Sequence, residues 1–267
     1  MLVYKMILGK VCVISAQIRR RIGSVSVVDI ETRFASSRME QGSVRLDRRR
    51  PAADQVYRFL RDAIITCKLE PNEAISENRI CGIFKISRSP VRTAITRLAE
   101  DGLIEIYPQR GTFVAPIKLK QVHEAQFARS ALEVSLAEEA ARHWTDQHSI
   151  LIKANLELQA HHAQSGDGSA FFSNNESFHQ LIACAAKLEG VWATVQSVKM
   201  LWDRIGHIAN RESAHTCYIV AEHWAIVNAL DQRHPQMAAE AMHQHLQSVN
   251  KTIARLRPLH ASYFSDQ

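Results

Sequence analysis

The sequence predicts a mainly α-helical protein with two folded domains, and two stretches carry this prediction. Residues 75–111 have the pattern of a helix, a tight turn, a second helix and a short hairpin. Residues 122–257 place apolar side chains at helical spacing in about six amphipathic segments, separated by short polar or glycine-containing breaks. The fold class we expect is an N-terminal winged helix-turn-helix followed by an all-helical antiparallel bundle of about six helices.

The first domain should begin with a helix at residues 54–69. Val56 and Leu60 lie on one apolar stripe of this segment, and Pro71 follows it as a stop signal. A second, shorter helix is expected at residues 77–84. A tight turn then leads into the third helix, so the order of elements is that of a helix-turn-helix.

The third helix carries the arginines that indicate DNA binding. Ser87 or Ser89 can cap its first turn, and Pro90 is tolerated only there, so the start of the helix is well defined. Arg88 and Arg92 are four residues apart and project together from a face other than the apolar one. Guanidinium groups in this position pair with phosphates and guanine edges when a helix enters the DNA major groove. We therefore interpret this segment as a recognition helix.

A hairpin with a basic tip follows the third helix. Gly102 can end that helix because glycine adopts positive φ without strain. Residues 103–114 then alternate apolar and polar side chains around Pro108-Gln109-Arg110-Gly111. This hairpin is the expected wing, with Arg110 placed to reach a phosphate or the minor groove.

Charge is distributed unevenly along the 267 residues, which carry a formal net charge of +6. Residues 1–50 hold 11 Lys and Arg against 4 Asp and Glu, residues 51–116 hold 9 against 8, and residues 117–267 hold 13 against 15. The DNA-binding segment is therefore not basic overall, and its case rests on where the arginines lie. We place a basic, flexible extension at 1–50, the winged helix-turn-helix at 51–117 and the helical bundle at 118–267.

The N-terminal extension and the cysteines bear on location. An apolar stretch at residues 1–16 precedes a basic cluster, but Lys5 and Lys10 interrupt it, so a signal peptide or membrane anchor is disfavoured. Met39 is an alternative start, and the extension is otherwise a basic arm that adds sequence-independent DNA affinity. The five cysteines are dispersed, without a CxxC pair, which favours a reducing cytoplasm.

The second half contains all 13 histidines, which indicates a different chemistry. Asn175 and His179 are four residues apart on one predicted helix, and His223 and His245 lie on the last two helices, which antiparallel packing can bring together. Three imidazoles with an oxygen donor suit Zn²⁺, Ni²⁺ or a similar divalent ion. The alternative is that these histidines are packed or solvent-exposed without a ligand, as single histidines on bundle helices commonly are.

The first domain resembles the DNA-binding domain of the GntR family of bacterial transcription regulators. The matching residues are Ile75-Ser76-Glu77, Ile80-Cys81, Ile86-Ser87-Arg88-Ser89-Pro90-Val91-Arg92, Ala94-Ile95, Leu98 and Gly102-Leu103-Ile104. The resemblance implies that Arg88, Ser89 and Arg92 contact the operator and that Arg110-Gly111 forms the wing tip. Lys85 stands where the family usually has glycine, so the backbone there is strained or the turn differs, and Lys85 gains a possible phosphate contact.

The second half resembles the FCD effector domain of the FadR-like branch of that family. The matching motifs are Arg129-Ser130-Ala131-Leu132-Glu133, Asn175-Glu176-Ser177-Phe178-His179, His223-Trp224-Ala225-Ile226 and Ala241-Met242-His243-Gln244-His245-Leu246. The resemblance implies that His179, His223 and His245 bind a metal and that Arg129 binds an anionic effector, although Arg129 can also pair with Glu133 on its own helix. Asn175 stands where the family commonly has aspartate, and a neutral amide binds a divalent ion more weakly. Either the metal site is empty or a carboxylate-bearing effector completes it.

These observations predict a cytoplasmic, homodimeric, ligand-responsive transcription regulator that is not an enzyme. We expect it to act as a repressor, to bind an inverted-repeat operator in double-stranded DNA, and to sense a small carboxylate. Two alternatives remain open at this point. One is a metal-dependent hydrolase with an accessory winged helix, although no HExxH motif accompanies the histidines. The other is a structural DNA-binding protein with an inactive, metal-free bundle.

Overall fold

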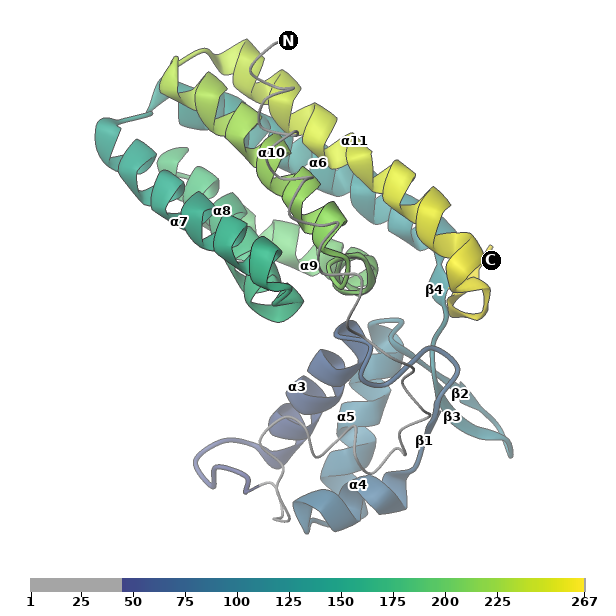
Figure 1. Ribbon diagram of the computed structural model, residues 1–267. Coiled ribbons are helices and arrows are strands. Elements are labelled where there is room, and N and C mark those ends of the chain that lie inside the picture. Colours follow the sequence, from purple (N-terminus) through teal and green to yellow (C-terminus); the bar gives the residue numbers. More distant parts are fainter. Residues whose placement is uncertain (1–44, 267) are drawn as a thin grey trace. The chain divides into compact units, whose positions relative to one another are not determined.

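The computed structural model describes residues 45–266 (Figure 1). Most of the basic extension, including Met39, lies outside the described residues. The first domain contains three helices and a small antiparallel sheet of strand order β1-β3-β2. Their bounds are α3 Ala52–Ile65, β1 Ala74–Ile75, α4 Glu77–Phe84, α5 Arg88–Glu100, β2 Ile104–Tyr107 and β3 Gly111–Val114. The predicted winged helix-turn-helix is therefore present, with one short strand that was not expected.

The end of α3 differs from the prediction. The helix stops at Ile65 and not at Leu69. The Thr66 hydroxyl donates to the Asp62 carbonyl at 2.7 Å, and Cys67 then turns the chain with a φ of 51°. The signal that ends the helix is thus this turn, several residues before Pro71.

The helix-turn-helix has the expected boundaries. The helix α4 begins at Glu77 and ends at Phe84, and the Ser76 side chain accepts a hydrogen bond from the Arg79 amide at 3.3 Å. In α5, Val91, Ala94, Ile95 and Leu98 are all buried, as their spacing predicts. The helix starts at Arg88, so the serine at the N-cap position is residue 87, and its side chain makes no capping hydrogen bond within the described residues.

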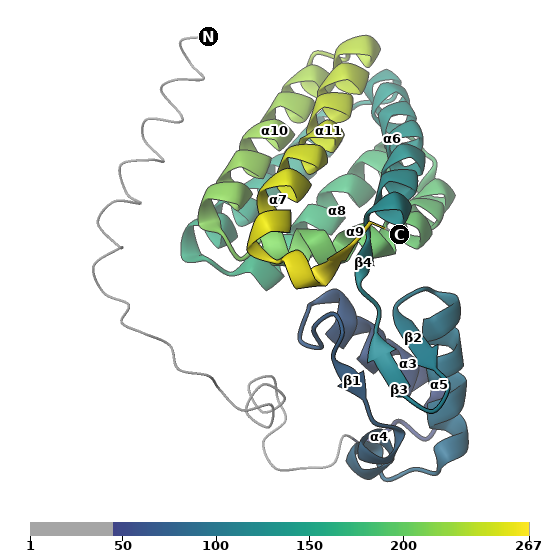
Figure 2. The same ribbon diagram turned by 90° about the vertical axis from the view of Figure 1, so that its right-hand side faces the viewer.

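The second domain is a bundle of six helices (Figure 2). Their bounds are α6 Leu119–Arg142, α7 Asp146–Ser165, α8 Gly168–Ala185, α9 Glu189–Ala209, α10 Ser213–Asp231 and α11 Pro235–Leu259. The helix α6 packs against α8, α9 and α11, while α10 packs against α7 and α11. Two short strands flank the bundle in the chain: β4 (Ile117–Lys118) precedes α6, and β5 (Phe264–Ser265) follows α11. They pair in parallel, and this pair was not predicted.

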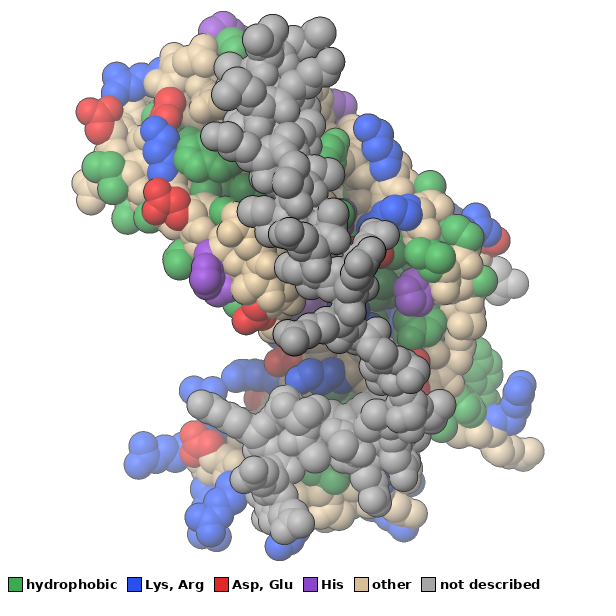
Figure 3. All heavy atoms as spheres, in the orientation of Figure 1, with side chains coloured by type: hydrophobic (Ala, Val, Ile, Leu, Met, Phe, Trp, Pro, Cys, Tyr) green, Lys and Arg blue, Asp and Glu red, His purple; other side chains and the backbone are tan. Residues whose placement is uncertain are grey.

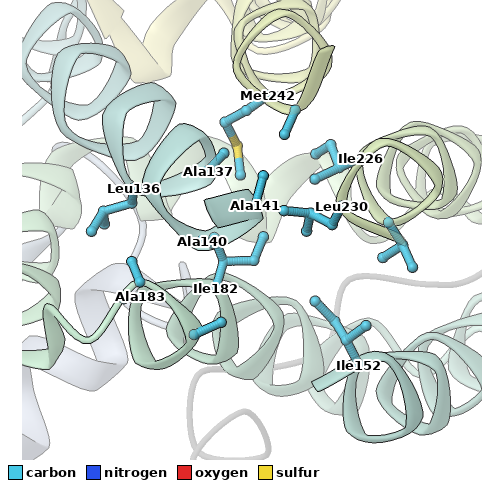
Figure 4. Close-up of a cluster of buried hydrophobic side chains, with 14 of the residues drawn as sticks. Leu136, Ala137, Ala140, Ala141, Ile152, Ile182, Ala183, Ile226, Leu230 and Met242 are labelled. Atoms are coloured by element: carbon cyan, nitrogen blue, oxygen red, sulfur yellow. The ribbon is translucent and has the colours of Figure 1, made fainter. Parts of the chain in front are cut away.

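The bundle core consists of buried apolar side chains from its helices, with alanines beside larger aliphatic and aromatic residues (Figure 4). Ala137, Ala140 and Ala141 on α6 leave room for Ile182 from α8 and for Leu230 from α10. Close packing of this kind holds the helices at fixed separations, so side chains that point inward have defined positions. No helix among residues 45–266 is long and apolar enough to cross a membrane.

Candidate functional site

The predicted DNA-contacting residues lie on the surface of the first domain. Arg88, Ser89 and Arg92 are exposed and line one shallow groove along α5, while the apolar face of the same helix is buried. Lys and Arg side chains gather around the edge of this domain (Figure 3). The Arg92 Nε atom lies 3.1 Å from Glu77 Oε2, and the Arg92 side chain is 67% exposed. Arg92 is therefore oriented by an acidic neighbour on α4 and still accessible to a ligand.

The remaining predicted contacts frame this helix. Lys85 and Ser87 are exposed in the turn between α4 and α5, and Lys85 has a φ of 52°. A left-handed conformation favours glycine, so of the two alternatives left open for Lys85 the structure has the strained backbone. At the wing tip Arg110 is exposed, and its guanidinium lies 5.6 Å from the Tyr107 ring. Gly111 follows with a φ of 114°, which disfavours any side chain there.

Three histidines from separate helices meet in the centre of the bundle. His179 on α8, His223 on α10 and His245 on α11 are all buried, and one ring nitrogen of each lies within 4.8 Å of the others. The ring of His223 stacks on Phe178 with 3.9 Å between centroids, which fixes its plane. Packing has thus placed three possible metal ligands around one point, as the sequence predicted for these residues.

Each of these rings has an oxygen atom at its Nδ1. Glu133 Oε2 lies 2.5 Å from His179 Nδ1, Gln159 Oε1 lies 2.9 Å from His223 Nδ1, and Glu222 Oε2 lies 2.9 Å from His245 Nδ1. Gln159 and Glu222 accept from Nδ1 of their histidines when that atom carries the proton, and the Nε2 lone pair of each of these two rings is then left for a ligand. His179 Nδ1 makes no hydrogen bond among the described residues, and His179 Nε2 lies 3.3 Å from an Arg129 guanidinium nitrogen. His223 Nε2 is buried and has no hydrogen-bond partner among the described residues.

The orientation of Gln159 is itself fixed by a chain of amides. Gln159 Nε2 donates to Asn155 Oδ1 at 2.7 Å, and Asn155 Nδ2 donates to the Asn174 carbonyl at 3.1 Å. A carbonyl can only accept, so the direction of every bond in this chain is determined. The Gln159 oxygen therefore faces His223 and selects the tautomer with the proton on Nδ1.

The protonation of the site suits metal ligation. Burial lowers the pKa of His179, although Glu133 opposes this effect. Burial, with the neighbouring His245 and His179, lowers the pKa of His223 well below its ordinary value. Both rings are accordingly neutral at physiological pH, which is the form that binds a metal.

Arg129 lies beside the histidine cluster. Its Nε donates to Glu133 Oε1, and its second terminal nitrogen lies 3.3 Å from His179 Nε2. Burial alone favours the neutral forms, but the ion pair outweighs this penalty, so the pKa of Glu133 stays well below its usual range and that of Arg129 above it. Arg129 can therefore pair with Glu133 on its own helix and still face a bound anion, because it also lines a cavity beside the cluster.

A cavity adjoins the cluster, with space of about 50 Å³ for solvent. Arg129, Asn175 and His245 line it, together with Glu176, Asp203 and Asn210. Asn175 therefore lies at the cavity, one helical turn before His179. The full lining is Arg129, Phe172, Asn175, Glu176, Trp202, Asp203, Gly206, Asn210, His215, Ile219, His245, Leu246, Ser248, Val249 and Thr252.

This region also contains four residues that the sequence did not single out, namely Gln159, Lys199, Asp203 and Glu222. Gln159 orients His223, and Glu222 orients His245. Lys199 Nζ lies 2.8 Å from a Glu176 carboxylate oxygen and 2.5 Å from an Asp203 carboxylate oxygen. Burial raises the pKa of Asp203 to about 6, and Glu176 adds to the effect while Lys199 opposes it. Glu222 directly precedes His223 in the chain, yet only the packing of α10 on α11 brings it to His245.

A DNA-binding winged helix joined to a helical domain with a polar internal cavity defines the class of ligand-responsive transcription regulators. Residues 52–114 match the bacterial regulatory proteins of the gntR family, and residues 124–248 match the FCD domain. The chain is 32% identical over 217 residues to the HTH-type transcriptional repressor RspR of Escherichia coli K12, covering 81% of this chain and 95% of that protein. It belongs to the GntR family and carries an FCD domain.

A further relative is a named repressor, and two solved structures share the fold. The HTH-type transcriptional repressor NanR of Salmonella newport is 28% identical over 211 residues, covering 68% of this chain and 77% of that protein. The solved structure of E. coli McbR/YncC has a TM-score of 0.64 at 18% identity and covers 78% of this chain and 98% of its own. A regulator from Rhodococcus sp. RHA1 has a TM-score of 0.63 at 20% identity, covering 76% and 97%. As a member of the GntR family with an FCD domain, the protein is a DNA-binding, ligand-responsive regulator and not an enzyme.

Proposed function

We propose that the protein is a cytoplasmic, homodimeric repressor that senses a small carboxylate together with a divalent metal ion. The observation that carries the metal site is the convergence of His179, His223 and His245, each with an oxygen atom within 2.9 Å of Nδ1. This donor set suits Zn²⁺ or Ni²⁺, because both accept neutral imidazole and both favour ligands held by outer hydrogen bonds. The sign of regulation follows the named repressors among the relatives.

A carboxylate effector is supported by the charges around the site. As metal ligands the three imidazoles bring no negative charge, and Asn175 adds an amide where a carboxylate would bring one. A buried cation is costly unless negative charge faces it, and an anionic effector would add to the charge that Glu222 supplies at His245. The metal, when bound, would offer open coordination positions to the carboxylate. Arg129 is already fixed beside His179 by Glu133 and can hold the same anion with its remaining donors.

The DNA-binding role is assigned to Lys85, Ser87, Arg88, Ser89, Arg92, Arg110 and Gly111. A homodimer would present two recognition helices to the two halves of an inverted repeat. The effector can change DNA affinity only as far as it binds one state of the protein better than the other. Ligand and operator must therefore weaken or strengthen each other by the same factor.

Calorimetry and DNA binding test the proposal together. Zn²⁺ and Ni²⁺ are titrated into the wild type, into His223→Ala and into His243→Ala, which removes an exposed histidine of α11 as a matched control. We expect metal binding to be lost in the first variant and retained in the second. DNA selected from a random-sequence library then serves as operator in gel shifts with and without metal and carboxylate. Two results would contradict the proposal and favour an inactive bundle. One is unchanged metal affinity in His223→Ala, and the other is an operator affinity that neither metal nor carboxylate changes.

A further inference from the structure

The wall that α8 and α9 contribute to the cavity is rich in hydrogen-bond acceptors. Lys199 is 2% exposed and is shared by two carboxylates, Glu176 at 2.8 Å and Asp203 at 2.5 Å. One cation thus serves two anions, and this group carries an excess of one negative charge. Both carboxylates line the cavity, whereas Lys199 does not. A molecule in the cavity therefore meets the acidic members of the group.

A second acceptor lies in the same wall. Asn210 is 6% exposed and lines the cavity, and its Oδ1 has no hydrogen-bond partner among residues 45–266. Buried acceptors are nearly always satisfied, because an unpaired one loses its bond to water without replacement. The side chain is therefore suited to receive a donor from a bound molecule.

We infer that Asp203 and Asn210 select an effector that has one carboxylate and additional hydrogen-bond donors. This inference rests on the proposed function, in which Arg129 and the histidine cluster receive the carboxylate. The donors are hydroxyl or ammonium groups, which bond to the Asp203 carboxylate and satisfy Asn210 Oδ1. A second carboxylate is disfavoured, since its negative charge would face the excess negative charge of the wall. Its oxygens could also only accept hydrogen bonds, where Asp203 and Asn210 Oδ1 need donors. A plain alkyl chain would leave Asn210 unsatisfied.

Four compounds of equal carbon number test this selection. Butyrate, L-threonate, 4-aminobutyrate and succinate are titrated calorimetrically into the full-length protein, with and without equimolar Zn²⁺. We expect threonate or 4-aminobutyrate to bind at least tenfold more tightly than butyrate, and succinate to bind more weakly than butyrate. The tighter of the two donor compounds identifies hydroxyl or ammonium as the preferred donor.

Two variants assign the selection to its residues. Asp203→Asn removes the excess charge, so we expect the discrimination against succinate to shrink at least fivefold. Asn210→Ala removes the orphan acceptor, so we expect the advantage of the donor compounds over butyrate to shrink. Glu189→Gln, an exposed position at the start of α9, and Asn228→Ala, an exposed position on α10, are the matched controls and should leave the ranking unchanged. Thermal melts confirm that each variant is folded before it is titrated.

The outcomes separate this inference from the proposed function. Equal affinity for all four compounds, or a ranking that Asp203→Asn and Asn210→Ala leave intact, would overturn the inference alone. Tighter binding of succinate than of threonate would also overturn it. Binding of none of the compounds, with metal still bound by the histidines, would overturn the carboxylate effector and this inference together.

Discussion

Gln159 Oε1 lies 2.9 Å from His223 Nδ1 in the centre of the bundle, and both residues are 0% exposed. Because both residues are buried, neither atom can exchange this bond for one to water. The amide chain through Asn155 to the Asn174 carbonyl sets the direction of the bond. A glutamine thus does for His223 what the Glu222 carboxylate does for His245, and does so without adding a charge.

Replacing Gln159 should therefore weaken metal binding without removing a ligand. In Gln159→Leu the Nδ1 of His223 loses its acceptor, so the ring is free to place its proton on Nε2 and block the ligand position. Loss of such an outer partner lowers metal affinity by about 10–100-fold. Calorimetric titration of Zn²⁺ measures the change. Gln164→Leu, an exposed glutamine on the same helix, is the control. Gln159→Glu keeps an acceptor and should recover most of the lost affinity, whereas a general loss of packing would not be rescued.

The DNA interface gives a prediction of a different kind. Arg92→Ala should lower specific operator affinity by about 1–3 kcal/mol and relax preference at one base pair, if Arg92 is bidentate to a guanine. Lys251→Ala removes one exposed charge from the bundle and should have no such effect. Gel-shift titration at fixed salt, with operator variants, measures both quantities. Because Glu77 holds the Arg92 guanidinium at 3.1 Å, Glu77→Gln should change affinity but keep the base preference. Unchanged affinity and preference in Arg92→Ala would exclude the assigned role.

Lys85 lies at the C-terminal end of α4 in a left-handed conformation, with a φ of 52°. Such a conformation costs most L-residues about 1–2 kcal/mol relative to their preferred regions. Lys85→Gly should therefore raise the free energy of unfolding by about 1 kcal/mol, while Lys85→Ala keeps the strain and should not. Chemical denaturation measures this difference. Both variants lose the charge, so both should reduce the salt dependence of DNA binding equally if Lys85 contacts a phosphate. A salt dependence equal to that of the wild type would assign Lys85 a purely structural position.

The local elements could be predicted because their signals are local. The bounds of α4 follow from Ser76 as its cap and from the apolar residues that α4 buries, and the start of α5 follows from Pro90 in its first turn. The strands β1, β4 and β5 were missed because each has two residues, too few for a period. Their pairing depends on partners far along the chain. Gly190 lies inside the first turn of α9 and not in the break before it, because the chain turns earlier, at Lys187 with a φ of 60°.

The same distinction applies to the cavity. His179, His223 and His245 could be proposed because the resemblance and the helical spacing placed them on inward faces. Gln159 and Lys199 could not be predicted, since neither belongs to a motif. Their partners His223 and Glu176 lie on other helices, so only the packed bundle brings these pairs together. Sequence patterns thus predicted which side chains converge, while the groups that orient them and set the local charge depend on tertiary contacts.

Asn175→Asp tests the charge argument of the proposed site directly. Asn175 lines the cavity one helical turn before His179, and the substitution changes the charge there while nearly preserving the size of the side chain. An aspartate would supply the negative charge that the effector otherwise brings. We therefore expect metal affinity to rise, by roughly tenfold for one added charge-assisted ligand, and carboxylate affinity in the presence of metal to fall.

Reciprocity provides the control for this last prediction. In the wild type, butyrate or threonate should raise Zn²⁺ affinity by the same factor by which Zn²⁺ raises carboxylate affinity. In Asn175→Asp that common factor should shrink, because the charge of the metal is already partly compensated. Calorimetric titrations in both orders, on both proteins, measure all four affinities, and the His245→Ala variant shows the limit without a complete site. The effector could instead bind equally well with and without metal, in the wild type and in His245→Ala. That result would show that the carboxylate does not bind at the histidine cluster, and Arg129 would be the assigned cationic group left to bind it.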